Sequence, residues 1–332
     1  MSARDGHNPD LPDEFSLIEK LFAPLAGPGA FALKDDAAVM QASVGCDLVL
    51  TKDAIAEGRH FLPSDPAGDV ARKLLRVNLS DLAAKGARPT GYLLACAWNE
   101  TTSFEWMTAF AEALHQDQNH FGLALLGGDT IRVEGPSVFS LTAIGEVPTG
   151  KMVRRSGAQP GDGLYVTGTI GDAALGLKVA LSEGFGLTEE AKATLLARYR
   201  VPNPPAGFGT QLSKFASSAL DVSDGLLGDL QHLCDASGVQ GVIERDIIPL
   251  SVEVTQLVCD RPELWANVLA GGDDYQILFT VEPERVELLT SVSAETNTSV
   301  TRIGRIIDGQ GVCLFGSNGE RVEIAESGFS HF

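Results

Sequence analysis

Apolar and polar positions in the first half of the chain predict both strands and helices. Residues 47–54 alternate with a period of two, which is typical of a strand. Residues 65–89 carry apolar side chains at helical spacing and end at Gly86 and Pro89, so we expect a helix there. The other elements expected in this half are a buried strand over 90–98, a helix over 101–122, a strand running into a glycine turn over 123–130, and a strand over 136–147.

The second half shows the same mixture of patterns, with more strands toward its end. Residues 219–238 predict the end of a strand, a capped turn and a helix that carries four leucines. The other expected elements are strands over 163–168, 275–281, 300–307, 311–316 and 321–326, and helices over 171–184, 188–205 and 205–218. Strands that alternate with helices and pair in mixed directions indicate an α+β architecture.

A change in composition marks the expected border between two domains. The segment "PTGKMVRRSGAQPGD" is rich in proline, glycine and basic residues, and 332 residues are enough for two domains. We therefore predict a polar, loosely ordered tail over 1–13, an N-terminal domain over 14–150 and a C-terminal domain over 151–332.

Charge and composition exclude several classes of function. A net charge of −19 argues against non-specific binding to nucleic acid. No apolar run approaches the roughly 20 residues that a membrane-spanning helix needs, and the N-terminus has no apolar signal segment. The five cysteines are scattered and lack CxxC spacing, which favours a reducing cytoplasm. P-loop, GxGxxG and HExxH motifs are absent from the sequence.

Acidic residues gather in short polar segments between apolar ones. "LDVSDGLLGDL" at 220–230 holds three aspartates whose like charges repel one another. Two pairs of segments also resemble each other: "NLSDLAAKG" with "DVSDGLLGD", and "LLGGDT" with "LAGGDDY". Duplication and chance explain this internal similarity equally well. The candidate members of one shared site are Asp35, Asp36, Asp53, Asp81, Asp129, Asp221 and Asp224.

Hard divalent cations would explain such a gathering, because they neutralise carboxylates and bind through oxygen. Mg²⁺ keeps several waters and takes one or two carboxylates together with substrate phosphates, so the pattern favours metal-dependent phosphoryl transfer. The glycines of "GGDT" would let backbone N–H groups approach a phosphate. A purely structural alternative stays open, in which Asp221 or Ser223 caps a helix over 224–237. Asp229 is expected to be a solvated residue of that helix.

Several segments, in the same order, resemble bacterial thiamine-monophosphate kinases over nearly the whole chain, from about Glu14 to Phe332. They include "KDDAAV", "LTKDAIAEGRHFLP", "VNLSDLAAKGARP", "LLGGDT", "LDVSDGLLGDL", "GGDDYQILF" and the closing "GFSHF". The resemblance places the chain in the aminoimidazole-ribonucleotide-synthetase superfamily of ATP-binding enzymes. It implies two domains with mixed sheets flanked by helices, ATP between the domains, and a homodimer that pairs the sheets of its N-terminal domains.

The resemblance further implies direct transfer of the γ-phosphoryl group of ATP to thiamine monophosphate, giving thiamine diphosphate, with several Mg²⁺ ions; it leaves a need for K⁺ open. Asp81, Asp129 and Asp224 are the implied catalytic positions. Metal binding falls on Asp36, Thr51, Lys52, Asp53, Asp81, Asp129, Asp221 and Asp224. ATP contacts fall on Gly128, Asp129, Arg155 and Ser223, and thiamine-phosphate contacts on His60, Asp273 and Phe329.

Three positions depart from the pattern of that family. Lys52 stands where serine or threonine is usual, so an ion bound through a hydroxyl would be lost there, while one bound through the main-chain carbonyl would remain. Asp273 replaces glutamate and Phe329 replaces tyrosine. We expect His60 to bind substrate and not to act as a base, because the acceptor phosphate oxygen is already anionic.

Two other functions compete with the kinase. One is an ATP-dependent synthetase of the same superfamily; "GRHFLP" and "GFSHF" favour thiamine phosphate instead, and selenophosphate synthetase is disfavoured because no early Cys or Lys lies in a glycine-rich motif. The other is a non-catalytic binder of nucleotide or thiamine, which Lys52 alone suggests.

Overall fold

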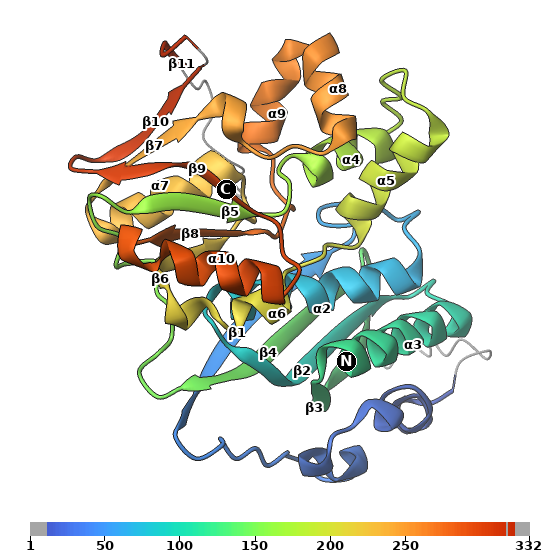
Figure 1. The fold of residues 1–332 in the computed structure, drawn as a ribbon. Coiled ribbons are helices and arrows are strands. Elements are labelled where there is room, and N and C mark those ends of the chain that lie inside the picture. The colour runs from blue at the N-terminus through green and yellow to red at the C-terminus, as the bar shows by residue number, and fades with distance from the viewer. Residues whose placement is uncertain (1–11, 317, 323–332) are drawn as a thin grey trace. The chain divides into compact units, whose positions relative to one another are not determined.

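The computed structural model describes residues 12–316 and 318–322, which divide into two compact units. The first takes in the described residues up to Val44 together with Leu50–Asn78 and Pro89–Gly145. The second takes in Gly45–Val49, Leu79–Arg88 and the described residues from Glu146 onward. Each unit is built around its own sheet (Figure 1).

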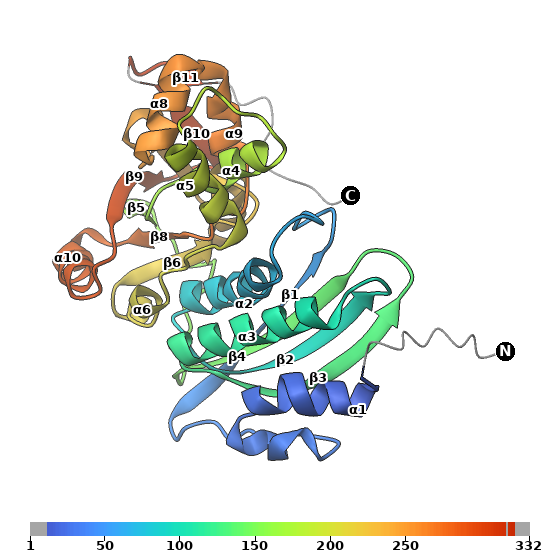
Figure 2. The ribbon, with the colours of Figure 1, turned by 90° about the vertical axis from the view of Figure 1, so that its right-hand side faces the viewer.

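Four described strands form the sheet of the first unit, in the order β1-β4-β2-β3, so that β1 and β3 are its edges. The α2 and α3 helices lie on one face of this sheet (Figure 2). The α3 helix starts at Ser103, whose side chain accepts from Trp106 N, and ends at left-handed Gly122, as the sequence predicts. The bounds are β1 Cys46–Ala56, α2 Ala67–Ala84, β2 Arg88–Asn99, α3 Phe104–Phe121, β3 Ala124–Val133 and β4 Val138–Pro148.

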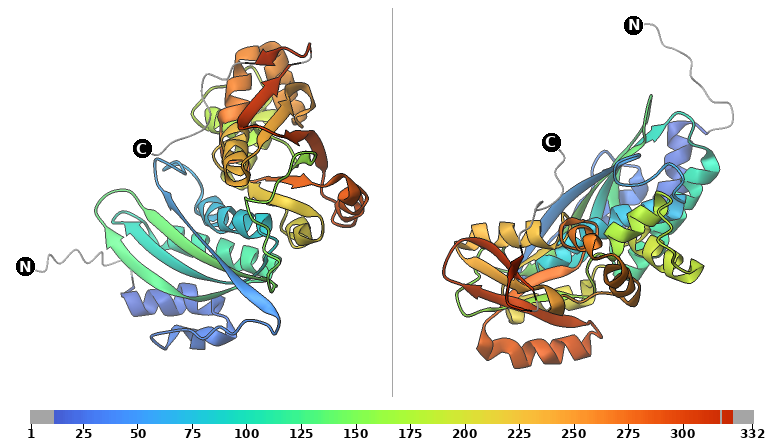
Figure 3. Two further views of the ribbon diagram at one scale, coloured as in Figure 1. Left: turned by 90° about the vertical axis from the view of Figure 1, so that its left-hand side faces the viewer. Right: turned by 90° about the horizontal axis from the view of Figure 1, so that it is seen from above.

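The segment before β1 runs along the β3 edge of the sheet (Figures 2 and 3). It forms the short helix α1 (Glu14–Leu17), a π-helical turn over Ile18–Phe22 and 3₁₀ turns over Ala23–Leu25 and Pro28–Leu33. The N–H of Gly27 donates to Leu125 O at 2.8 Å, and Gln118 donates to Leu25 O at 3.2 Å. These contacts hold the acidic segment that follows, with Asp35 and Asp36, beside β3.

Seven described strands form the sheet of the second unit, in the order β11-β10-β7-β9-β5-β8-β6. Alternate side chains of β5 enter two different cores: Leu164 and Val166 pack with α4, α7 and α8, and Tyr165 packs with Phe208 and Phe279. The strands are β5 Gly163–Thr167, β6 Ala216–Asp221, β7 Gln240–Glu244, β8 Ile277–Val281, β9 Val300–Ile307, β10 Gly311–Phe315 and β11 Arg321–Val322. The helices are α4 Asp172–Ala180, α5 Glu189–Arg200, α6 Ala206–Gly209, α7 Leu226–Ser237, α8 Val252–Asp260, α9 Trp265–Ala270 and α10 Val286–Glu295.

Two expected elements are wrong. The strand over 123–130 does not end in a glycine turn, because β3 continues through Gly127 and Gly128 to Val133. The helix expected over 205–218 is reduced to the single turn of α6 and a 3₁₀ turn over Leu212–Lys214. The last residue of α6, Gly209, packs against α2 so closely that a Cβ there would come within 2.6 Å of the Ala83 Cα.

Two further findings concern the described helices and the cysteines. No helix in this part of the chain is both long and apolar enough to cross a lipid bilayer. All five cysteines are free, and Cys96 and Cys234 are buried.

Candidate functional site

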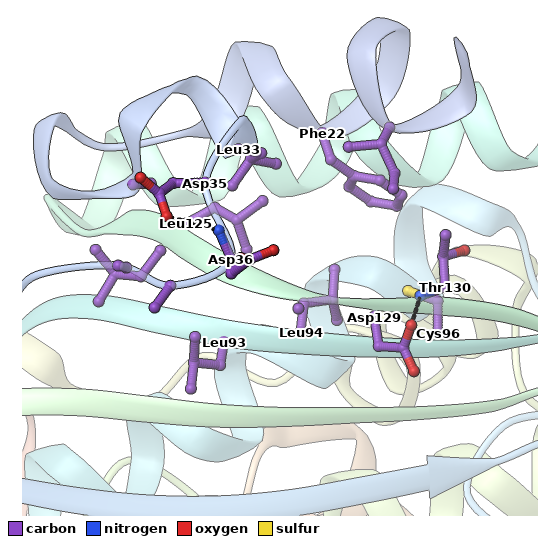
Figure 4. A pocket seen from close by; sticks show the side chains of 17 residues that line it. Phe22, Leu33, Asp35, Asp36, Leu93, Leu94, Cys96, Leu125, Asp129 and Thr130 are labelled. Atoms are coloured by element: carbon purple, nitrogen blue, oxygen red, sulfur yellow. Dashed lines mark hydrogen bonds between the residues drawn. The ribbon is translucent and has the colours of Figure 1, made fainter. Parts of the chain in front are cut away.

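A cavity of about 220 Å³ lies in the first unit, between the N-terminal segment and the strands β2 and β3 (Figure 4). Its walls are largely apolar and include Phe22, Leu33 and Leu94. Asp36 from the N-terminal segment and Asp129 from β3 both line it. The structure therefore brings two predicted metal ligands to one cavity, beside the predicted nucleotide residue Gly128.

The "GGDT" segment fits against β2 so closely that one of its glycines is obligatory. A parallel pairing sets Gly128 beside Leu94, and a Cβ on Gly128 would lie 1.8 Å from Leu94 O. A side chain at this position would push the two strands apart. The absence of a side chain at Gly128 therefore allows β2 and β3 to pack closely. The next residue, Asp129, is exposed on the edge strand. Asp129 Oδ1 accepts from Thr130 N at 2.9 Å.

The three predicted metal-binding positions on β1 point in two directions. Thr51 and Asp53 are half-buried, on the same face as buried Val49 and Ile55, whereas Lys52 is exposed on the other face. The N–H of Asp53 donates to Asn78 Oδ1 of α2 at 3.0 Å, which fixes this part of the edge strand. If Lys52 contributes a ligand to an ion bound by Thr51 and Asp53, that ligand must therefore be its main-chain carbonyl oxygen.

His60 follows β1 in a tight turn whose hydrogen bond involves the imidazole. The N–H of Ala56 donates to His60 Nδ1 at 3.1 Å, so this nitrogen is an acceptor and carries no proton. The main-chain oxygen of His60 accepts from Lys73 Nζ at 2.9 Å. The ring is held in one orientation, with Nε2 as the nitrogen that carries the proton in the neutral form.

In the second unit, the "DVSDG" segment forms an irregular loop between β6 and α7, and the side chain of Asp229 binds the backbone of this loop. Asp229 Oδ2 accepts from the N–H groups of Ser223 and Asp224, both at 3.0 Å. The expectation that Asp229 is solvated is wrong, since it is 3% exposed and burial raises its pKa to about 7. Gly225, with φ of +115°, occupies the N-cap of α7, so neither Asp221 nor Ser223 caps that helix.

Asp221 ends β6 in a buried environment that also holds residues of the α2 C-terminal turns. Ser80 Oγ donates to Asp221 Oδ2 at 2.8 Å. Burial raises the pKa of Asp221 well above its usual range, and the negative charge of Asp81 adds to the rise. Lys85 Nζ donates to Ala219 O at 2.8 Å, and burial lowers the pKa of Lys85 to about 8. The structure therefore brings Asp81 and Asp221 together, with a lysine that the sequence analysis did not single out.

The "GGDD" segment lies against the "DVSDG" loop through its backbone. Asp273 N donates to Ser223 O at 2.9 Å, and Tyr275 N donates to Val222 O at 2.8 Å. A Cβ on Gly272 would lie 2.1 Å from Ser223 O, so this close approach requires glycine. Asp273 and Tyr275 both have positive φ, of 71° and 50°. The predicted substrate residue Asp273 and the predicted nucleotide residue Ser223 are thereby adjacent.

Asp274 anchors the "GGDD" loop to the start of α4. Its two carboxylate oxygens accept from Gly171 N at 2.7 Å and from Ala173 N at 3.2 Å. Burial raises the pKa of Asp274 to about 8, and the two N–H donors oppose that rise. Tyr275 Oη donates to Asp273 Oδ1 at 3.2 Å. Asp274 thus fixes the loop from which Asp273 projects.

Arg155 is exposed, and its positive charge acts on both Lys85 and Asp229, which places it near the "DVSDG" loop. Phe329, the last predicted substrate residue, lies outside the described residues. Sequence reasoning missed Ser80, Lys85 and Asp274. A signal existed for two of them: Lys85 is a lone cation in the apolar run "DLAAKGA", and Asp274 lies three residues before the buried strand "ILFTV".

Within each unit, the predicted metal ligands lie in small groups. No three carboxylate, imidazole or thiolate side chains of the described residues gather closely enough to hold a metal ion. Asp36 and Asp129 share the cavity in the first unit, Thr51 and Asp53 lie together on β1, and Asp81 lies near Asp221 in the second unit. All are oxygen donors, the kind that Mg²⁺ binds.

Two domain families match the chain and together cover most of it. The N-terminal domain of AIR synthase related proteins matches residues 34–147, and their C-terminal domain matches residues 159–316. Thiamine-monophosphate kinase from Caulobacter vibrioides is 40% identical over 325 residues, which cover 96% of this chain and 91% of that protein.

Solved structures show the same similarity. The crystal structure of thiamine-monophosphate kinase from Stenotrophomonas maltophilia K279a aligns with a TM-score of 0.79 and 38% identity, over 87% of this chain and 91% of that one. A structure described as AaThiL complexed with AMPPCP and TMP aligns with a TM-score of 0.77 and 29% identity, over 96% of this chain and 94% of that one.

Proposed function

The chain belongs to the thiamine-monophosphate kinase family of AIR synthase related proteins, and we propose from this premise that it transfers the γ-phosphoryl group of ATP to thiamine monophosphate. The product is thiamine diphosphate. The observation that carries the proposal is a 40% identity to such a kinase over 96% of the chain. A related structure whose description names both AMPPCP and TMP supports the pair of substrates.

The oxygen atoms of the predicted metal ligands are of the kind that binds Mg²⁺, so these residues fit a magnesium-dependent reaction. Bound Mg²⁺ ions would neutralise the phosphate oxygens and set donor and acceptor in line. In the first unit, Asp36, Asp129, Asp53 and the Thr51 hydroxyl would hold them. In the second unit, Asp81, Asp221 and Asp224 would do so. Asp81, Asp129 and Asp224 are the proposed catalytic positions, and the chain's own contribution is to hold these oxygens in fixed places.

Lys52 does not remove a metal ligand in this proposal. Its side chain lies on the face of β1 opposite to Thr51 and Asp53, so a serine hydroxyl at this position would also face away from them. We assign the metal contact at position 52 to the main-chain carbonyl, which every residue type supplies. Lys52 was the only reason to consider a non-catalytic binder of nucleotide or thiamine, and this reason therefore no longer holds.

Binding of the two substrates follows from the loops already described. Gly128, Asp129, Ser223 and Arg155 are the proposed ATP contacts, since the guanidinium of Arg155 suits phosphate. The N–H groups of Ser223 and Asp224 donate to Asp229 instead, which holds the loop that carries the Ser223 side chain. His60 and Asp273 are the proposed contacts to thiamine monophosphate, and Phe329 remains a proposal from the sequence.

No group in the described site needs to act as a strong base. The attacking atom is a phosphate oxygen that is already anionic near neutral pH, so removing a proton gains little. His60 Nδ1 accepts a backbone hydrogen bond and is not available to take a proton. Transfer is then direct from ATP to the acceptor, without a phosphoenzyme, and the residues act by positioning and by neutralising charge.

The proposal extends to the state in which the protein works. We propose a homodimer formed by residues 14–150, the ATP- and metal-binding domain, with residues 151–332 as the second domain. We further propose that it works in the cytoplasm, which the free cysteines favour. It needs several Mg²⁺ ions, and a requirement for K⁺ is tested by replacing K⁺ with Na⁺ in the assay.

The test is product formation by the purified protein with ATP, Mg²⁺ and thiamine monophosphate. Chromatography should show thiamine diphosphate and ADP in equal amounts, with no label retained on the protein when γ-labelled ATP is used. Consumption of ATP that requires an amide or carbonyl acceptor, with no thiamine diphosphate, would instead identify a synthetase. Absence of any turnover with fully magnesium-loaded protein would remove the kinase proposal.

A further inference from the structure

We propose that Asp229 is a positioning residue that holds the "DVSDG" loop and the "GGDD" loop in one register, and that it couples the binding of nucleotide to the binding of thiamine monophosphate. The inference rests on the proposed function, in which Ser223 and Asp224 serve the nucleotide and its ions and Asp273 serves the acceptor. All four residues belong to the second unit.

The peptide group between Ser223 and Asp224 is hydrogen-bonded on both sides. Its N–H, on Asp224, donates to Asp229 Oδ2 at 3.0 Å, and its carbonyl, on Ser223, accepts from Asp273 N at 2.9 Å. The N–H and the C=O of a trans peptide point in opposite directions, so one rigid plane connects the Asp229 carboxylate to the backbone of the "GGDD" loop. A rotation of this plane would break both hydrogen bonds together.

The preceding peptide group, between Val222 and Ser223, repeats this arrangement. Its N–H, on Ser223, donates to the same Asp229 Oδ2 at 3.0 Å, and its carbonyl, on Val222, accepts from Tyr275 N at 2.8 Å. A single carboxylate oxygen therefore fixes two successive peptide planes, and each plane bonds to the "GGDD" loop on its other side. The two loops form one hydrogen-bonded unit, with Asp229 at one end of it.

Close packing prevents the two loops from sliding past each other. A Cβ on Gly272 would lie 2.1 Å from Ser223 O, and a Cβ on Gly225 would lie 2.7 Å from Ala270 O. Asp229 itself is buried in the first turns of α7, where its N–H donates to Gly225 O at 3.0 Å. The carboxylate is therefore held in place by its own helix, and the peptide planes follow its position.

The proposed acceptor residue lies at the other end of this unit. Tyr275, whose N–H bonds to Val222 O, also donates from its hydroxyl to Asp273 Oδ1 at 3.2 Å. A nucleotide that orders Ser223 and Asp224 would thereby order the side chain of Asp273 as well. Because the first ligand already orders both loops, the second ligand loses less entropy on binding and binds more tightly.

Calorimetry with thiamine monophosphate and a non-hydrolysable ATP analogue with Mg²⁺ measures the coupling. The affinity for thiamine monophosphate is determined with and without saturating analogue in wild-type protein, Asp229→Leu and Asp229→Asn. Leucine has a similar size and accepts no hydrogen bond, whereas the amide oxygen of asparagine can accept from both N–H groups. Asp235→Asn is the matched control, because Asp235 is an exposed aspartate of the same helix whose side chain accepts from Gln231.

We expect the analogue to raise the affinity for thiamine monophosphate by at least about fivefold in wild-type protein and in Asp235→Asn. Asp229→Leu should lower this factor to less than about twofold, and Asp229→Asn should keep at least about half of it. Circular dichroism checks that each variant is folded. If Asp229→Leu does not fold, Asp229→Ala is measured in its place, because it removes the carboxylate without adding bulk.

Hydrogen–deuterium exchange gives a second readout that needs neither ligand. The N–H groups of Ser223 and Asp224 lose their acceptor in Asp229→Leu, so the peptide that contains them should exchange at least about tenfold faster than in wild-type protein. The same peptide should exchange at the wild-type rate in Asp235→Asn.

Three results would overturn the proposal. The first is a wild-type protein whose affinity for thiamine monophosphate does not change with the analogue, and the second is an Asp229→Leu variant with the wild-type coupling factor. The third is an Asp229→Asn variant as uncoupled as Asp229→Leu, because charge and not hydrogen bonding would then be responsible. Failure of the proposed function looks different: thiamine monophosphate would not bind to wild-type protein at all. In that case, unchanged exchange in Asp229→Leu would overturn the positioning role itself.

Discussion

The two segments that resemble each other in sequence, "LLGGDT" and "LAGGDD", have unlike structures and surroundings. The first is part of the straight edge strand β3, with Asp129 exposed beside a cavity. The second is an irregular loop with positive φ at Asp273 and with Asp274 buried. In both, the second glycine allows a close backbone approach, to Leu94 O in one and to Ser223 O in the other. A glycine pair followed by aspartate therefore identifies close packing, and the neighbouring segments decide what the aspartate does.

The largest difference between the two segments should appear in turnover. Asp129→Asn removes one charge from the proposed metal site and should lower kcat by roughly 100-fold to 1000-fold, the usual cost of losing one electrostatic contact in a transition state. Because Asp129 is exposed and asparagine keeps the oxygen that accepts from Thr130 N, the free energy of unfolding should change by less than about 0.5 kcal/mol. Steady-state kinetics and urea denaturation measure the two; a variant with normal kcat would contradict the catalytic assignment.

The glycines of β3 allow a matched comparison of packing. Gly128→Ala should destabilise the protein by about 2 kcal/mol or more, because its Cβ would overlap Leu94 O at 1.8 Å. Gly127→Ala is the control, since its nearest neighbour, Leu93 Cδ2, lies 3.6 Å away. Denaturant unfolding measures the loss in the free energy of unfolding for each variant. Equal losses in the two would mean that alanine acts through the strand backbone and not through the contact with Leu94.

The aspartate of the second segment should affect affinity and leave the chemical step intact. Asp273→Asn should raise KM for thiamine monophosphate by roughly tenfold, which corresponds to about 1.4 kcal/mol, and should leave kcat within about twofold. KM for ATP should be unchanged, because the backbone contact from Asp273 N to Ser223 O does not involve the side chain. A fall in kcat with both KM values unchanged would move Asp273 into the catalytic group.

Buried Asp274 should make stability depend on pH. Its pKa is about 8 in the folded protein against an ordinary value of 3.8, so the folded state keeps a proton that the unfolded state has lost. Its contribution is therefore complete below pH 4 and is lost as pH rises toward 8, by up to about 1.4 kcal/mol per pH unit. Thermal unfolding between pH 5 and 7.5 should show a falling free energy of unfolding, with a shallower slope in Asp274→Asn. Equal slopes in the two proteins would exclude this carboxyl as a source.

Local patterns predicted the elements whose boundaries are set by nearby residues. The start of α3 at Ser103 and its end at Gly122 are examples, and so is the order of strands and helices from β1 to β4. In the second half the sequence analysis did not predict β7, α8, α9 or α10. The resemblance of motifs identified the family, which the domain matches confirm. Which predicted site residues bind which ligand remains a proposal.

Features that depend on contacts distant in sequence could not be predicted. Asp229 is not such a case, because it lies three residues after Leu226 and four before Leu233, on the leucine face of α7, and it is buried there. Gly128 reads as a turn residue, and its role depends on the distance to Leu94 in another strand. The separation of Asp53 from Asp129 depends on the order of strands in the sheet, which the sequence does not encode locally.

The measurement that tests the central claim most directly is the affinity of a non-hydrolysable ATP analogue with and without Mg²⁺. The account holds that an acidic site accepts a polyanion because cations lie between them. Calorimetry with saturating Mg²⁺ should give clear binding, and removal of the ions with EDTA should weaken it by at least about tenfold, because carboxylates and phosphates then face each other directly. Equal affinity in the two conditions would contradict the account.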